Sequence, residues 1–144
     1  MESSRRLAAI MFTDIVGYTA LMGKDEDNAL KLLHRNRVFH KAIISRYGGE
    51  WLKEMGDGTL ASFNTSTDGV RCAAAIQDES EKEGISLRIG IHVGEVVFEG
   101  KDVFGDGVNI ASRIQELAPS GGIRLSESVH KNVLNKRGIE TTFV

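Results

Sequence analysis

A hairpin in the middle of the sequence limits the folds open to this chain more than any other feature. Two stretches that favour strands, Glu50–Met55 and Thr59–Phe63, flank a Gly-Asp-Gly turn at residues 56–58. Asp-Gly between such stretches strongly indicates a tight turn, because glycine readily adopts the positive φ that the turn requires. Asp57 at the tip is by itself an ordinary turn former. With Lys53 four residues earlier, Asp57 is also suited to phosphate and metal chemistry. Other parts of the sequence are needed to distinguish these two interpretations.

Size and composition predict one globular domain. A chain of 144 residues with 41% hydrophobic and 26% charged residues can bury a core without disulfide or metal staples. The formal net charge of −2 gives no general attraction to nucleic acid or to anionic membranes, so we expect neither as a partner. No apolar run approaches the ~20 residues of a membrane span, so we expect no direct membrane contact from this chain.

Cysteine usage indicates a reducing compartment. Cys72 is the single cysteine, so no intrachain disulfide can form, and we expect a cytoplasmic location. Its neighbours are apolar at helical spacing, which favours a buried and inert thiol over a nucleophile.

Strand and helix patterns alternate along the chain. An apolar run predicts a first strand that ends at Gly17, and Asp25 predicts the N-cap of a long helix that ends before Gly48. The basic residues of this helix are interleaved with a single aromatic side chain, Phe39, at a core spacing, which favours a solvated face; they are Lys31, Arg35, Arg37 and Lys41. The predicted elements are a strand at Leu7–Val16, the long helix, the hairpin, a helix from about Thr65 to Lys82, a strand at Leu87–Phe98, a helix from Asp106 or Gly107 to before Pro119, a strand at Ile123–Ser126, a helix to about Leu134 and a strand at Ile139–Val144.

This order predicts an α+β domain. Its first half, β-α-β-β-α-β, is the ferredoxin-like arrangement, with helices on one face of a mainly antiparallel sheet. The remaining elements form a C-terminal extension. The absence of a linker-like run or an internal repeat indicates that residues 1–144 form one domain, and the apolar pattern at the C-terminal end suggests a domain cut from a longer multidomain protein.

The end of the first strand is the first stretch that could carry chemistry. Asp14 lies near the end of the apolar run, and a glycine-containing turn then leads toward a helix. The backbone N–H groups of Val16, Gly17, Tyr18 and Thr19 could form an anion-binding nest beside the Asp14 carboxylate. A triphosphate with Mg²⁺ requires this combination, because carboxylates bind the hard metal ion and amides bind phosphate oxygens. The alternative is an aspartate that merely hydrogen-bonds a turn.

Two further stretches complete the set of candidates. If Asp57 approaches Asp14 across neighbouring strands, the two carboxylates form a platform for one or two metal ions.

On the helix after Gly107, Ile110, Ala111, Ile114 and Leu117 form a stripe that we expect to face the core. Asn109 and Arg113 lie one turn apart on another face. Arginine can stabilise a transferring phosphoryl group and asparagine can hold a hydroxyl, although a solvated polar face is an equally good interpretation of this helix alone.

Taken together, these motifs resemble the catalytic domain of class III adenylyl and guanylyl cyclases, which has a palm-type core. The resemblance covers essentially the whole chain. Four motifs in the family's order and spacing carry it: Phe12-Thr-Asp-Ile-Val-Gly-Tyr-Thr19, Lys53-Glu-Met-Gly-Asp57, Leu87-Arg-Ile-Gly-Ile-His-Val-Gly94 and Val103-Phe-Gly-Asp-Gly-Val-Asn-Ile-Ala-Ser-Arg113.

The resemblance implies a role for each candidate residue. Asp14 and Asp57, with the backbone carbonyl of Ile15, would hold two Mg²⁺ or Mn²⁺ ions. Lys53 and Asp102 would read the base, and this pair is the one typical of adenylyl cyclases, whereas guanylyl cyclases typically have Glu and Cys. Asn109 would orient the ribose, Arg113 would stabilise the transition state and Arg88 would bind a phosphate.

The implied reaction converts ATP to 3′,5′-cyclic AMP and pyrophosphate. The family's sites lie at a head-to-tail dimer interface, so the resemblance also implies a homodimer with two shared sites. One departure is that the family's further C-terminal hairpin, which carries a triphosphate-binding lysine, does not follow Val144 in this sequence. The alternatives are guanylate cyclase activity, a diguanylate cyclase-type domain suggested only superficially by Gly48-Gly-Glu-Trp51, and a catalytically silent nucleotide-binding or dimerisation module.

Overall fold

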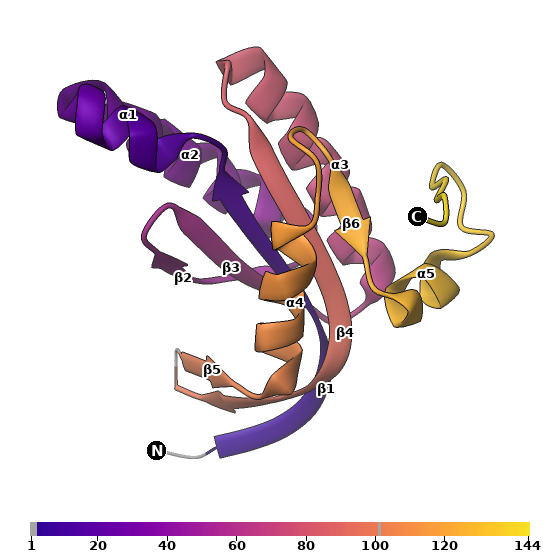
Figure 1. The fold of residues 1–144 in the computed structure, drawn as a ribbon. Helices are drawn as coiled ribbons and strands as arrows, with labels where there is room; N and C mark the ends of the chain where they lie inside the picture. The colour runs from indigo at the N-terminus through magenta and orange to yellow at the C-terminus, as the bar shows by residue number, and fades with distance from the viewer. Residues whose placement is uncertain (1–2, 101) are drawn as a thin grey trace.

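The computed structural model describes residues 3–100 and 102–144, which form a sheet with helices on both sides (Figure 1). The strands and helices, in chain order, are β1 (Ser3–Ile15), α1 (Tyr18–Lys24), α2 (Glu26–Arg46), β2 (Glu50–Met55), β3 (Gly58–Phe63), α3 (Ser66–Glu83), β4 (Leu87–Glu99), β5 (Asp102–Phe104), α4 (Asp106–Glu116), β6 (Ile123–Leu125) and α5 (Glu127–Val133).

The sheet has the predicted mainly antiparallel topology. Its strands follow the order β2-β3-β1-β4-β5, and β6 pairs with β4 as the one parallel neighbour among the described strands. The longest pairing joins β1 to β4 over their whole lengths. The α+β class and the palm-type core are therefore confirmed.

Local signals explain where the helices begin. The Asp25 carboxylate accepts from the N–H of Asn28, and the hydroxyls of Thr65 and Ser126 cap α3 and α5 in the same way. Gly84 ends α3 with a φ of 71°, a left-handed conformation that glycine adopts without strain. The role of Asp25 as an N-cap was predicted from the sequence.

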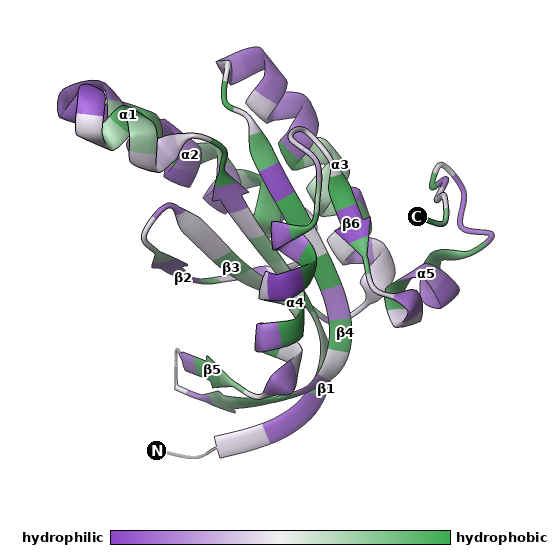
Figure 2. Cartoon of the chain, viewed as in Figure 1, coloured by the Kyte–Doolittle hydropathy of each residue, from purple (hydrophilic) through white to green (hydrophobic). Residues whose placement is uncertain are grey.

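The two long helices of the first half share one face of the sheet, as predicted, whereas α4 of the C-terminal extension covers the opposite face. Helices α2, α3 and α5 pack on one side, where residues such as Met11, Ile44 and Ile76 form the larger core cluster. Helix α4 packs on the opposite side, where Ala111 contacts a smaller cluster with Ile10 and Leu60. Figure 2 shows the apolar residues running along the central strands between these layers. The face that carries α4 is consequently covered by one helix.

Helix α4 lies very close to the sheet because Gly90 has no side chain. A Cβ atom at Gly90 would meet the backbone of Gln115, 2.6 Å from its Cα, and the carbonyl oxygen of Ala111 at 2.8 Å. Gly107, Ala111 and Gln115 are the buried residues of this helix. The predicted core stripe is therefore wrong for Leu117, which is 64% exposed, and only partly right for Ile110 and Ile114, which are half-buried.

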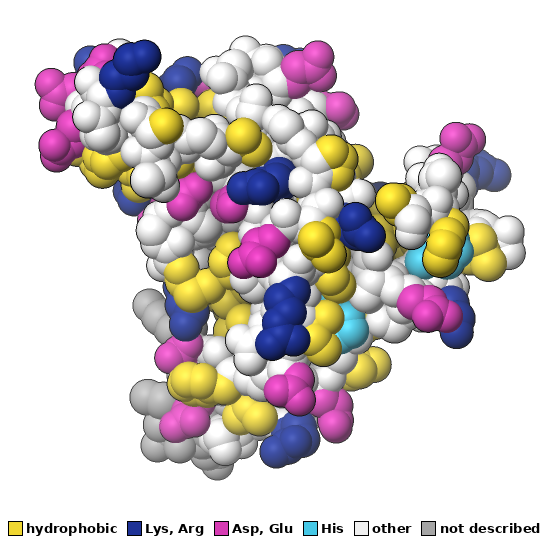
Figure 3. Space-filling view, viewed as in Figure 1, with side chains coloured by type: hydrophobic (Ala, Val, Ile, Leu, Met, Phe, Trp, Pro, Cys, Tyr) yellow, Lys and Arg dark blue, Asp and Glu magenta, His cyan; other side chains and the backbone are white. Residues whose placement is uncertain are grey.

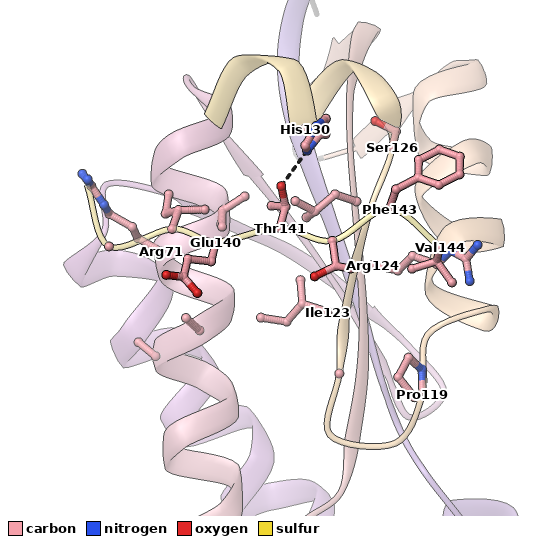
Figure 4. Close-up of a pocket in the computed structure, with 18 of the residues that line it drawn as sticks. Arg71, Pro119, Ile123, Arg124, Ser126, His130, Glu140, Thr141, Phe143 and Val144 are labelled. Atoms are coloured by element: carbon pink, nitrogen blue, oxygen red, sulfur yellow. Dashed lines mark hydrogen bonds between the residues drawn. The ribbon is translucent and has the colours of Figure 1, made fainter. Parts of the chain in front are cut away.

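Three elements differ from the sequence prediction. Residues 139–144 form no strand, and α1 and β5 were not predicted. The C-terminal segment instead lies over β6, α3 and α5 and borders a cavity of about 810 Å³, where the Thr141 hydroxyl and His130 Nδ1 lie 2.7 Å apart in a hydrogen bond (Figure 4). Among the described residues, no helix has the length and apolar character needed to cross a membrane.

Candidate active site

The hairpin tip lies against the end of β1. The Ile15 N–H donates a hydrogen bond to Asp57 Oδ2 at 3.1 Å. Pairing of β1 with β3 brings this tip to the strand end, since Thr13 lies opposite Thr59 in the register. Asp57 therefore lies beside the residue that follows Asp14, so the geometry brings the two acidic candidates to one corner of the sheet.

Arg88 is the partner of Asp14. The two residues are opposite each other in the β1–β4 register, and Arg88 Nε lies 3.4 Å from Asp14 Oδ1. Their side chains are 35% and 22% exposed, so the pair is accessible to a ligand from solvent. An arginine held here places a permanent positive charge beside the candidate metal carboxylate.

One N–H group of the predicted anion-binding nest is used in a hydrogen bond within the chain. The Val16 N–H donates to the carbonyl oxygen of Ser86 at 2.8 Å, so Val16 is excluded as a phosphate donor. Gly17 then takes a left-handed conformation with a φ of 77° and precedes α1. The N–H groups of Tyr18 and Thr19 open this helix and have no acceptor within it. The remaining candidates for phosphate donors are therefore Gly17, Tyr18 and Thr19.

Lys53 and Asp102 form a direct ion pair between β2 and β5. Lys53 Nζ lies 2.7 Å from Asp102 Oδ1, which also accepts from the N–H of Val103. The hydrogen bond from Lys53, followed by that from Val103, lowers the pKa of Asp102 below its ordinary value. Both side chains remain more than one-third exposed, so a ligand can reach the pair.

Asn109 and Arg113 lie on the exposed side of α4. Among the described residues, no hydrogen bond or salt bridge ties either side chain to the Asp14–Arg88 pair or to the Lys53–Asp102 pair. Phe104 and Leu117, which border this helix in sequence, are 49% and 64% exposed. Figure 3 shows apolar side chains interspersed with charged ones on the face that carries α4.

Strand alternation places the candidate side chains of the sheet on this same face. Thr13 and Ile15 face α2 and the larger core cluster, so Asp14 between them points to the α4 side. The same argument applies to Arg88, between Leu87 and Ile89. Lys53 lies opposite Leu60 of the smaller cluster and so shares the α4 face. One open face therefore carries two ion pairs and the polar side of α4.

A buried polar contact lies behind this face and was not predicted from the sequence. His40 on α2 is fully buried, with Nε2 2.9 Å from the Thr13 hydroxyl and Nδ1 2.8 Å from the Asn36 carbonyl oxygen. Because the carbonyl can only accept, Nδ1 carries the proton and Nε2 accepts from Thr13. Burial lowers the pKa of His40 to about 4, so the ring is neutral at pH 7. A histidine at a helical core position was the only sequence signal.

The oxygen donors at the corner fit a hard divalent cation. Asp14 and Asp57 supply carboxylates and Ile15 a backbone carbonyl, the ligand types that Mg²⁺ and Mn²⁺ prefer. Across residues 3–100 and 102–144, no three His, Cys, Asp or Glu side chains converge to hold a metal by themselves. A metal ion here would therefore need further oxygens, such as those of a triphosphate. The 810 Å³ cavity is a different place, since none of the candidate residues lines it.

Comparisons with known proteins identify the family of this chain. The profile of the adenylate and guanylate cyclase catalytic domain matches residues 2–144. Putative adenylate cyclase 3 of Rhizobium meliloti is 39% identical and matches over 94% of this chain, which spans 25% of that protein. Adenylate cyclase of Streptomyces coelicolor is 30% identical over 94% of this chain and 36% of its own length. The chain thus spans between a quarter and about a third of these two relatives.

A solved structure shows the same fold. The adenylate/guanylate cyclase/hydrolase from Silicibacter pomeroyi is 37% identical, with a TM-score of 0.83 over 96% of this chain and 86% of that chain. The profile match over nearly the whole sequence, together with this similarity of fold, shows that the chain belongs to the adenylate and guanylate cyclase catalytic domain family.

Proposed function

We propose that this domain converts ATP to 3′,5′-cyclic AMP and pyrophosphate. The observation that carries the proposal is the collection of candidate side chains on the one open face of the sheet. There, Asp14 and Arg88 lie at the end of β1 and β4, Lys53 and Asp102 form an ion pair, and α4 presents Asn109 and Arg113 to solvent. The relatives named adenylate cyclase support this choice of reaction.

Lys53 and Asp102 would distinguish the base. Adenine presents a ring nitrogen that accepts a hydrogen bond and an exocyclic amine that donates one. Lysine can only donate and an ionised carboxylate can only accept, so the pair matches adenine. Guanine has a carbonyl oxygen and a protonated ring nitrogen at the corresponding positions, so it fits this pair less well. We therefore favour ATP over GTP as the substrate.

The triphosphate would lie at the corner formed by β1, β4 and the hairpin tip. Arg88 and the N–H groups of Gly17, Tyr18 and Thr19 would bind phosphate oxygens, while Arg113 would stabilise the charge that develops during transfer. Asn109 would orient the ribose so that its 3′-hydroxyl faces the α-phosphorus. Two Mg²⁺ or Mn²⁺ ions held by Asp14, Asp57 and the Ile15 carbonyl would supply Lewis-acid activation of the hydroxyl and neutralise the leaving pyrophosphate.

Two chains would be needed for each site. Within the described part of one chain, no contact links Arg113 or Asn109 with Asp14, and the face between them is open and partly apolar. A second copy placed head to tail would cover this face and bring its own Arg113 to the first copy's Asp14. We therefore propose a homodimer with two equivalent shared sites.

Turnover assays test the proposal. The purified chain is incubated with ATP or GTP in the presence of Mg²⁺ or Mn²⁺, and the products are separated by chromatography. We expect cyclic AMP and pyrophosphate from ATP in equal amounts, with slower turnover of GTP. Faster formation of cyclic GTP would identify a guanylate cyclase, and binding of nucleotide with no cyclic product would identify a silent nucleotide-binding module.

A further inference from the structure

Strand β2 contains an irregularity immediately before Lys53. Trp51 pairs with Ala61 and Lys53 pairs with Leu60, so Leu52 is an extra residue opposite the β3 strand. Such a bulge interrupts the alternation of side chains and often re-aims one of them beside an active site. Here it lies one residue from the proposed base-reading lysine.

The bulge determines which face Lys53 occupies. Trp51 packs against the larger core cluster on the α2 side, whereas Leu52 packs against the smaller cluster on the α4 side. Regular alternation would return Lys53 to the α2 side. With the bulge, Lys53 shares the α4 face with Leu52 and reaches Asp102, and Glu54 takes the α2 side.

Helix α2 contacts the residues on both sides of the bulge. Lys41 Nζ lies 4.4 Å from the centroid of the Trp51 ring, and Arg37 Nε lies 2.7 Å from Glu54 Oε1. Arg37 and Lys41 are four residues apart and therefore neighbours on one side of the helix. These contacts correct the prediction that the basic residues of α2 only form a solvated face.

The Arg37–Glu54 contact is the stronger of the two constraints. The Glu54 side chain is only 18% exposed, and its Oε2 atom is buried with no partner among the described residues. Loss of Arg37 would leave this carboxylate partly desolvated and unpaired. Strand β2 lies at the edge of the sheet, held by hydrogen bonds on one side, so a shift by one residue is its simplest route to release Glu54.

We propose that Arg37, assisted by Lys41, is a positioning residue for nucleotide specificity. By holding Glu54 on the α2 side, Arg37 maintains the Leu52 bulge and keeps Lys53 directed toward Asp102. The inference rests on the proposed function, because Lys53 matters for specificity only if it reads the base. The geometric part, that Arg37 controls the Lys53–Asp102 ion pair, stands independently of catalysis.

Arg37→Met is the test variant, and Arg35→Met is its matched control. Arg35 lies on the same helix but forms its ion pair with Glu83 of α3, away from β2. Two readouts are compared: the carboxyl pKa of Asp102, measured by NMR, and the ratio of kcat/KM for ATP to that for GTP. Lys53→Met shows how far the Asp102 pKa rises when the ion pair is removed completely.

In Arg37→Met we expect the Asp102 pKa to rise most of the way to its value in Lys53→Met. The ratio of kcat/KM for ATP to that for GTP should fall by about fivefold or more. Arg35→Met should match the wild type in both. Exchange of the partners, Arg37→Glu with Glu54→Arg, should restore most of both properties. If Arg37→Met does not fold, Glu54→Met removes both the ion pair and the hydrogen bond to Arg37 with a side chain of similar length.

An Asp102 pKa that stays at its wild-type value in folded Arg37→Met or Glu54→Met would overturn the proposal. Equal losses of turnover with ATP and GTP, at an unchanged ratio, would also overturn it, because they would indicate a purely structural role. If the wild type forms no cyclic nucleotide, the proposed function fails, while the NMR comparison still decides whether Arg37 controls the ion pair.

Discussion

The Ile15 backbone N–H donates a hydrogen bond to the Asp57 carboxylate across 42 residues of sequence. This contact joins the tip of the central hairpin to the end of β1 and places Asp57 beside Asp14. An aspartate that only formed the turn would have no need to reach another strand. The hydrogen bond is made to Oδ2, and among the described residues Asp57 forms no salt bridge.

The first prediction separates the charge of Asp57 from its hydrogen bond. Asp57→Asn keeps an oxygen that can accept from Ile15, so the melting temperature should stay close to that of the wild type. Turnover should fall by about 100-fold or more, because a neutral amide is a much weaker ligand for a divalent cation. Asp27→Asn, at an exposed position in the first turn of α2, serves as the control. Full activity in Asp57→Asn would show that the carboxylate has no catalytic function.

The second prediction concerns the base. Lys53→Glu combined with Asp102→Cys should lower the ATP/GTP ratio of kcat/KM by about tenfold or more, because the donor and acceptor that match adenine are both lost. The control is a matched double variant of the exposed Lys131–Glu127 ion pair of α5, Lys131→Glu with Glu127→Cys. An unchanged ratio in the first double variant would refute the base-reading role.

The third prediction tests the close approach of α4 to the sheet. Gly90→Ala places a Cβ against the backbone of Gln115 and Ala111, which cannot move as a flexible side chain would. We expect a loss of roughly 1–3 kcal/mol in the free energy of unfolding and a lower kcat, because α4 carries Asn109 and Arg113. Gly23→Ala, in α1 with no atom within 4 Å of the added Cβ, should be tolerated. Denaturant unfolding and turnover of both variants check this.

The fourth prediction concerns pH and His40. The pKa of its buried ring is lowered to about 4 from an ordinary value of 6.5, so the unfolded chain binds this proton more readily than the folded one. Stability should therefore fall as the pH drops from 6.5 to 4, with a His40 contribution of about 3 kcal/mol, and level off below that. The measurement is the difference in unfolding free energy between the wild type and His40→Gln across this range.

The matched control for His40 is the exposed His34 on the same helix. His34→Gln should follow the wild type at every pH, whereas His40→Gln should lose less stability than the wild type on acidification. Parallel curves for the wild type and His40→Gln would contradict the assignment of a neutral, buried ring.

Much of the fold follows from local sequence signals. The hairpin, the cap at Asp25 and the long apolar strands were predicted because turn chemistry, capping and periodicity act over a few residues. The tertiary details were not predictable in this way. Strand β5 has three residues, too few for a period, and α1 has seven. The residues from Ile139 onward have a strand-like composition, yet no neighbouring strand pairs with them in the described structure.

The site shows the same division between local and tertiary information. The motifs predicted which residue types belong to the site. They did not predict that these residues share one face of the sheet, because that depends on α4 packing on the side opposite α2 and α3. The Leu52 bulge and the Arg37–Glu54 pair left no local signal either. The hydrogen bond from Val16 to Ser86, which removes one amide from the nest, likewise joins segments far apart in sequence.

The most direct test of the shared ATP site is complementation between two inactive variants. Asp14→Ala and Arg113→Ala are assayed alone and after mixing in equal amounts under conditions that allow subunit exchange, with cyclic AMP formation from ATP as the readout. Each variant alone should be inactive. Half of the dimers in the mixture should be hybrids with one intact site of two, so about a quarter of wild-type activity should return. No recovery in a mixture shown to contain hybrid dimers would contradict a site built from both chains.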